Sequence, residues 1–135
     1  MKIAFATETR DPNGVIAMTL ADAPFLLIAD LDKKEILEVV TANKTDREMV
    51  YAKKTVEHKC ELIICGDIEE KDAFETLSDD GVTRQRGAGL TVTQATKAML
   101  SGTLPYIKDH VGGNGCPGED ETKIRGLNCL GMEEE

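Results

Sequence analysis

The sequence predicts an α/β domain built on a mixed sheet, and three observations support this. The chain has 135 residues and 41% hydrophobic residues, which is enough for one buried core. Short apolar runs at residues 2–7, 25–31 and 60–65 are typical of buried strands. Beyond residue 45, strand-like runs alternate with helical patterns, which indicates βαβ units. Because aromatic residues make up only 4% of the chain and Trp is absent, we expect an aliphatic core.

The N-terminal half predicts strands joined by turns. The run at residues 2–7 is the first strand, and the turn residues of Asp11–Gly14 follow it. Residues 15–19 are a possible second strand. Residues 25–31 form the clearest strand of this half, and residues 35–40 return beside it as an antiparallel partner.

The second half predicts three helices separated by strands. Thr45 and Glu48 have capping-box spacing, so a helix should begin there and bury one face. The apolar positions expected along that face run from Met49 to Val56. A strand at residues 60–65 should end at Gly66. The remaining expected elements are a helix at 71–77, a strand at 82–86, and a helix at 92–100 capped by Thr91.

The character of the chain changes after Pro105. Residues 108–135 contain three basic and seven acidic side chains, with a glycine-rich run at 112–118 and no apolar period. We therefore expect a domain at residues 1–105 and an acidic, Gly- and Cys-containing C-terminal tail at residues 106–135, mobile unless something binds it.

Composition and charge exclude several functions. A net charge of −9 disfavours nucleic-acid binding, and no apolar run approaches the length of a membrane span. The apolar start is too short for a signal peptide, so we expect a cytoplasmic protein whose four cysteines are thiols or metal ligands. Carboxylates that could hold magnesium in a nuclease are present, but no basic groove accompanies them. No catalytic triad or Cys–His spacing is evident, so we expect no enzyme activity.

Five segments stand out by their order and spacing: Met1–Thr7, Ala23–Asp32, Leu62–Ile68, Leu77–Val82 and Gly87–Val92. Together they resemble the dinitrogenase iron–molybdenum cofactor biosynthesis family, the small NifX- and NafY-like carriers, over residues 1 to about 105. The resemblance implies a three-layer ribonuclease-H-like fold with a mixed central sheet and flanking helices. It also implies a carrier for an iron–molybdenum or other metal–sulfur cluster, as an accessory to nitrogen fixation.

The sequence departs from this family at two places. Many relatives have a His-Phe-Gly-Arg-like segment before Ala23, whereas this chain has Met18 to Asp22 there, without His or Gly. The usual glycine-rich loop before the first helix is replaced by Thr41 to Thr45. If the missing His holds the cluster in relatives, this chain must use other ligands or has lost the activity.

The first candidate site lies at the carboxyl end of the sheet, where ligands collect in α/β proteins. We expect a pocket walled by residues 7–22, 65–68 and 87–89. Cys65 is the candidate metal ligand, although a buried core cysteine is an alternative. Cys60 should lie about 16 Å away on the opposite face of the strand, in the core. The other residues predicted to contact the cofactor are Gly66, Asp67, Gly87 and Gly89, of which the glycines can equally serve a tight turn.

The second candidate set lies in the predicted tail. His110, Cys116 and Cys129 could bind a metal, since the surrounding glycines would let both thiolates approach it. Their spacing fits no zinc-finger pattern, and a plain tail is the alternative. We therefore predict a non-catalytic metal- or cluster-binding carrier whose partner is a metallocofactor assembly or acceptor protein. The alternative is a protein-interaction or regulatory module that has the fold but no cluster.

Overall fold

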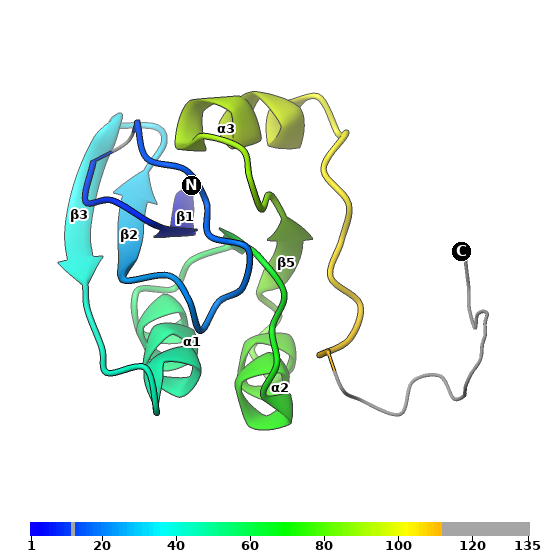
Figure 1. Ribbon diagram of the computed structural model, residues 1–135. Helices are drawn as coiled ribbons and strands as arrows, with labels where there is room; N and C mark the ends of the chain where they lie inside the picture. Colours follow the sequence, from blue (N-terminus) through cyan, green and yellow to red (C-terminus); the bar gives the residue numbers. More distant parts are fainter. Residues whose placement is uncertain (12, 112–135) are drawn as a thin grey trace.

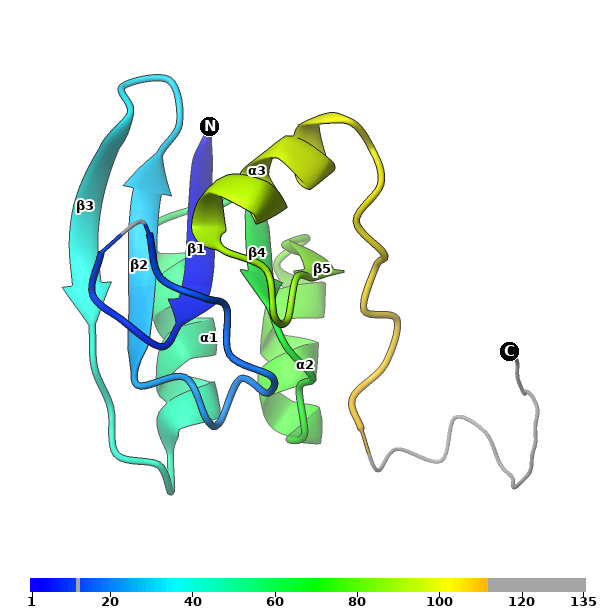
Figure 2. The same cartoon turned by 45° about the horizontal axis from the view of Figure 1, so that its top comes forward.

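The computed structural model describes residues 1–11 and 13–111. A five-stranded sheet forms the middle layer, with α1 and α2 on one face and α3 on the other (Figures 1 and 2). This arrangement confirms the predicted three-layer α/β fold with a mixed sheet. In the described part of the chain, no helix is long and apolar enough to cross a membrane.

The elements follow the predicted order. The strands and helices are β1 (Lys2–Thr7), β2 (Phe25–Asp30), β3 (Glu35–Val40), α1 (Arg47–Glu57), β4 (Leu62–Cys65), α2 (Lys71–Asp79), β5 (Thr83–Arg86) and α3 (Val92–Leu100). The cap predicted for α3 is confirmed, because Thr91 accepts from the Gln94 N–H and Gln94 accepts from the Thr91 N–H.

The sheet has the strand order β3-β2-β1-β4-β5. β2 is antiparallel to both of its neighbours, β1 and β3. β4 runs parallel to both β1 and β5. This order and direction are those of a ribonuclease-H-like sheet. The carboxyl ends of β1, β4 and β5 therefore meet at one edge, which we call the carboxyl edge.

Strand alternation divides the core into two clusters. Ala4, Ile63 and Cys65 face α1 and α2, whereas Phe5 and Ile64 face α3. Because successive side chains point to opposite faces, neighbours in one buried strand serve different layers.

The predicted beginning of α1 is wrong in its detail. Asp46, not Thr45, precedes the helix, and no side chain caps it. Glu48 does not reach back but is 1% exposed and accepts from the backbone N–H groups of Glu69 and Glu70. The buried face also includes Tyr51, whose hydroxyl donates to the Ala23 carbonyl at 2.8 Å. Tertiary contacts therefore replaced the local capping box.

The segment at residues 15–19 is not the predicted strand. It forms only isolated bridges, from Ile16 to Thr7, from Val15 to Thr91 and from Thr19 to Asp67. These partners lie at the end of β1, just before α3 and just after β4, so the segment crosses the carboxyl edge instead of pairing along one strand.

Residues 105–107 run along the outer edge of β5. The Arg86 N–H donates to the Pro105 carbonyl, and the Ile107 N–H donates to the Arg84 carbonyl. Leu104 packs in the α3-side cluster and Ile107 in the cluster of α1 and α2, so the chain passes around the sheet edge. The first residues of the predicted tail thus contact the domain, whereas the rest lies outside the described residues.

Candidate functional site

The segment of residues 15–20 covers the carboxyl edge and is held there by its backbone. The Ala17 N–H donates to the Ala6 carbonyl, and the Leu20 N–H donates to the Asp67 carbonyl at 2.8 Å. The Asp67 N–H in turn donates to the Met18 carbonyl at 3.0 Å. The segments that were predicted to line the pocket, including residues 7–22 and 65–68, are therefore adjacent. Backbone hydrogen bonds join them directly.

Gly66 and Asp67 have clear structural partners at this edge. A Cβ atom on Gly66 would lie 2.1 Å from the Met18 carbonyl oxygen, so only glycine allows this close approach. The Asp67 carboxylate accepts from the Arg86 Nε at 2.9 Å, and both side chains are about 40% exposed. Asp67 thus presents an ion pair, rather than a free carboxylate, to the surface.

Gly87 and Gly89 shape the turn from β5 into α3. A Cβ atom on Gly87 would lie 2.7 Å from Ile64, whereas Gly89 has a φ of +86° and donates its N–H to the Ile16 carbonyl. At the beginning of α3, the N–H groups of Val92 and Gln94 donate to the Gly14 carbonyl and the Thr91 hydroxyl. These groups are engaged within the chain, which favours the tight-turn interpretation of the two glycines over contact with a cofactor.

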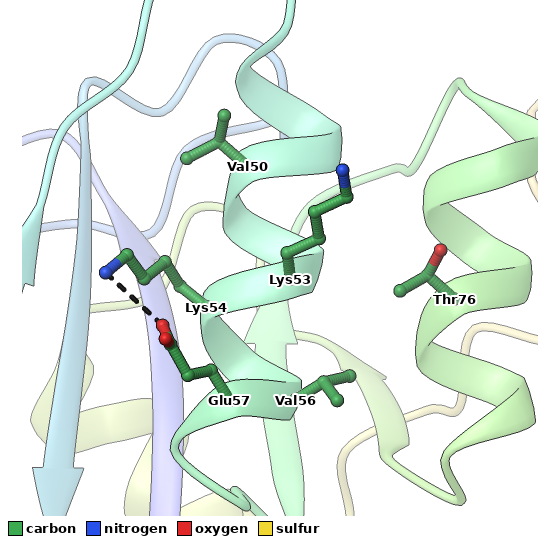
Figure 3. A pocket seen from close by; sticks show the side chains of 6 residues that line it. All are labelled: Val50, Lys53, Lys54, Val56, Glu57 and Thr76. Atoms are coloured by element: carbon green, nitrogen blue, oxygen red, sulfur yellow. Dashed lines mark ion pairs between the residues drawn. The ribbon is translucent and has the colours of Figure 1, made fainter.

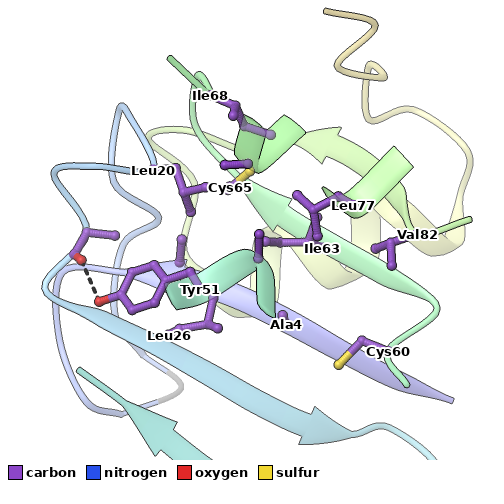
Figure 4. Packing of buried hydrophobic residues seen from close by; sticks show 14 of the residues in the cluster. Ala4, Leu20, Leu26, Tyr51, Cys60, Ile63, Cys65, Ile68, Leu77 and Val82 are labelled. Carbon is purple, nitrogen blue, oxygen red and sulfur yellow. Dashed lines mark hydrogen bonds between the residues drawn. The ribbon is translucent and has the colours of Figure 1, made fainter. Parts of the chain in front are cut away.

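Both described cysteines lie inside the core. Cys65 is 0% exposed, and burial raises the pKa of its thiol well above the usual range, with Glu48 and Asp67 adding to the shift. Cys60 is 5% exposed, and burial raises its pKa to about 11. Figure 4 shows the two at opposite ends of one cluster, so the prediction that they face opposite sides is wrong. Cys60 precedes β4, so strand alternation does not apply to it.

The predicted tail ligands divide between two parts of the chain. His110 Nδ1 lies 2.8 Å from Asp109 Oδ1, and the centre of its imidazole ring lies 6.4 Å from that of Phe74 in α2. Cys116 and Cys129 lie outside the described residues. Within residues 1–11 and 13–111, no group of three or more His, Cys, Asp or Glu side chains is placed to hold a metal ion.

Met18 is the residue at this edge that sequence reasoning did not name as a donor. Its side chain is 56% exposed while its backbone is bonded to Asp67. Arg10, whose guanidinium lies 5.4 Å from the centre of the Phe25 ring, comes from the preceding loop. The signal for Met18 was its place in the segment where the resemblance led us to expect a His.

A mainly apolar groove lies elsewhere in the described part of the chain. A cavity of about 430 Å³ opens between α1 and α2, lined by Val50, Val56 and Thr76 among others (Figure 3). Lys54 in its rim pairs with Glu57 at 3.3 Å. This groove contains no soft donor, so it does not offer a site for a cluster.

A scan of the sequence against models of known families gives a match over most of the chain. The family model described as dinitrogenase iron-molybdenum cofactor matches residues 1–102. The chain belongs to this family. The resemblance stated from the five segments is therefore confirmed. No curated protein matches the sequence.

Solved structures share this family fold. The apo form of the orange protein from Desulfovibrio gigas is 21% identical, with a TM-score of 0.69, and the match covers 80% of this chain and 93% of that one. A candidate NifB protein from Thermotoga, assigned to the DUF35 family, is 25% identical, with a TM-score of 0.70 and coverages of 83% and 98%. A candidate dinitrogenase from Methanocaldococcus jannaschii is 19% identical, with a TM-score of 0.60 and coverages of 81% and 96%.

Proposed function

We propose that this protein is a non-catalytic carrier that binds a metal–sulfur cluster, of the iron–molybdenum type or a related one, and passes it to an assembly or acceptor protein. Membership in a family described by that cofactor supports the proposal. So does the shared fold with a protein whose structure was solved as an apo form.

The surface chemistry of the carboxyl edge also supports a cluster as cargo. The Met18 thioether is a soft donor, of the kind that copper and iron–sulfur species prefer, and it projects from a backbone that hydrogen bonds hold in place. Arg86 adds positive charge at this edge, although Asp67 partly neutralises it, and Arg10 adds a guanidinium over Phe25, at the beginning of β2. A cluster made negative by its sulfides would be attracted to these guanidinium groups.

On this proposal, the thiolate ligands come from the part of the chain after Val111, which contains Cys116 and Cys129. Metal binding requires deprotonated thiols, and burial disfavours that form in Cys60 and Cys65. The observation that carries the proposal is the hydrogen bond from the Val111 N–H to the Ile68 carbonyl at 2.7 Å, one residue beyond Asp67. Five residues span at most about 17 Å, so Cys116 follows Val111 within that reach.

The test compares cysteine variants after anaerobic expression and reconstitution. We expect Cys116→Ser and Cys129→Ser, singly or together, to lose most of the bound metal, measured by metal analysis and by the absorption spectrum of the cluster. Cys60→Ser and Cys65→Ser are the matched controls, because they remove the same atom from the core. They should retain the metal if the proteins remain folded by circular dichroism.

Two outcomes would contradict the carrier proposal. One is that the wild-type protein binds no metal under these conditions, and the other is that all four variants bind as the wild type does. Loss in Cys65→Ser alone, with unchanged folding, would return the ligand role to the carboxyl edge.

The second candidate function is a protein-interaction module without a cluster. The observation that favours it is the edge strand β3, where Ile36 and Leu37 are 38% and 39% exposed. Exposed apolar side chains on an edge strand are typical of interaction surfaces. If the wild-type protein binds no metal after reconstitution, the interaction module becomes the favoured function.

A further inference from the structure

Arg84 has an unusual environment for a cation. It is the second residue of β5, and its guanidinium lies 4.8 Å from the centre of the Phe74 ring. Its Nη1 donates to the Val82 carbonyl, whereas its Nε is buried and has no hydrogen-bond partner among the described residues. No carboxylate of the described residues forms an ion pair with it. A buried charged N–H without an acceptor is costly, so this group favours an acceptor from outside.

A cavity of about 470 Å³ adjoins Arg84 on the surface. It lies between the end of α2, the beginning of β5 and the segment that runs along that strand. The polar side chains that line it are those of Ser78, Thr83, Arg84, Tyr106 and Lys108. These supply two cations and three hydroxyl groups but no carboxylate.

We propose that this cavity binds a small molecule through a phosphate or similar oxyanion. Because the Val82 carbonyl engages Nη1, Arg84 would offer its Nε–H and the neighbouring Nη2–H to two oxygens of one phosphate. Lys108, an exposed residue that also lines the cavity, adds a second charge, and the hydroxyls of Thr83 and Ser78 can donate to the remaining oxygens. The ring of Tyr106, which is 62% exposed, offers an aromatic face for the rest of the ligand.

Nearby negative charge lowers the expected affinity for phosphate but does not prevent binding. Asp79 and Asp80 follow Ser78 at the end of α2, where the last helix carbonyls also point. Both carboxylates are exposed and outside the lining of the cavity, so water and salt screen them. We therefore expect binding that is selective but of modest strength.

This site is independent of the proposed carrier function. It lies at the amino end of β5, whereas Arg86 and Gly87 lie at the carboxyl edge. Failure of cluster binding would leave the phosphate site untouched, and the reverse is also true.

The test is a titration with inorganic phosphate, followed by proton–nitrogen NMR on the full chain at constant ionic strength. We expect saturable shifts of the Arg84 Nε–H and of the Thr83 and Lys108 amides. Arg84→Gln should weaken binding at least about tenfold, because a charged, two-point contact is lost. Lys108→Gln, at an exposed position that leaves folding intact, should weaken it about threefold.

Lys53→Gln is the matched control. It removes the same charge from an exposed lysine that lines the groove between α1 and α2. We expect its affinity for phosphate to equal that of the wild type. Shifts that rise linearly without saturation, or equal effects of Lys53→Gln and Lys108→Gln, would overturn the proposal, since both indicate adventitious attraction to surface charge only.

Discussion

Glu48 ties α1 to the loop that leads into α2. Its carboxylate, 1% exposed, accepts from the N–H groups of Glu69 and Glu70 at 2.8 to 3.1 Å. Burial raises its pKa above the usual 4.5, the two backbone hydrogen bonds oppose that shift, and the charges of Glu69 and Glu70 add to it. The same side chain also raises the pKa of Cys65. One buried acid therefore ties α1 to the chain that follows Asp67 and adds to the effect of burial, which is the main cause of the raised pKa of the Cys65 thiol.

The raised pKa of Glu48 predicts a specific pH dependence. Because the folded state holds this proton more tightly than the unfolded state, the carboxyl stabilises the fold most below about pH 4.5 and less as the pH rises through the folded pKa. Glu48→Gln cannot ionise. Gln also replaces one acceptor oxygen by a donor, so we expect it to cost about 1–3 kcal/mol at the acidic end.

The measurement is the free energy of unfolding of both proteins by urea between about pH 4 and pH 7. The advantage of the wild type over Glu48→Gln should shrink as the pH rises. Glu35→Gln, at an exposed position, controls for the loss of one negative charge. An advantage that grows with pH would show that the ionised carboxylate, not the neutral acid, is favoured in the fold.

At the scale of elements, the segment after α3 acts as a partial sixth strand. Gln85 bridges to Tyr106 in antiparallel fashion, and the side chain of Ile107 is buried beside α2. This pairing covers the edge of β5 that would otherwise expose backbone groups. The boundary at Pro105 stays a prediction, but the described chain shows that stabilising contacts continue as far as Val111.

Ile107→Ala should destabilise the domain. The side chain is 8% exposed, and removing a buried Ile to Ala costs about 2–4 kcal/mol, with the lower values at positions near the surface. Tyr106→Ala, at an adjacent residue that is 62% exposed, should cost less than about 1 kcal/mol. Thermal and urea unfolding of the full-length variants measure both. Equal, small effects would mean that residues 106–111 form a tail without a structural role.

At the scale of the whole molecule, the described core and the predicted ligands are separate. The domain supplies an edge joined by backbone hydrogen bonds with Met18 exposed, whereas the proposed thiolates come from Cys116 and Cys129, outside the described residues. Because those thiols must lose protons to bind, metal retention should fall as the pH falls. We expect metal content after equilibration to decrease steadily from about pH 8 to pH 5.5, while circular dichroism stays constant. Retention independent of pH would argue against thiolate ligands.

The sequence by itself determined the order of the elements and the family. The strands were predictable because apolar runs such as residues 25–31 and 60–65 carry the strand pattern locally. The cap at Thr91 was predictable for the same reason, since donor and acceptor lie three residues apart. The turns at Gly66, Gly87 and Gly89 also carry local signals, and the structure confirms their tight backbone.

Only the tertiary structure decided how distant residues meet. Thr45 and Glu48 have capping-box spacing, but Glu48 turned instead to two N–H groups more than twenty residues away. Residues 15–19 were expected as a possible strand, yet their bridge partners Thr7, Thr91 and Asp67 lie in three separate parts of the chain. The burial of Cys65, the exposure of Met18 and the unpartnered Nε of Arg84 also depend on neighbours distant in sequence. Propensity and spacing act over a few residues, whereas burial and hydrogen-bond pairing are set by the packing of the whole chain.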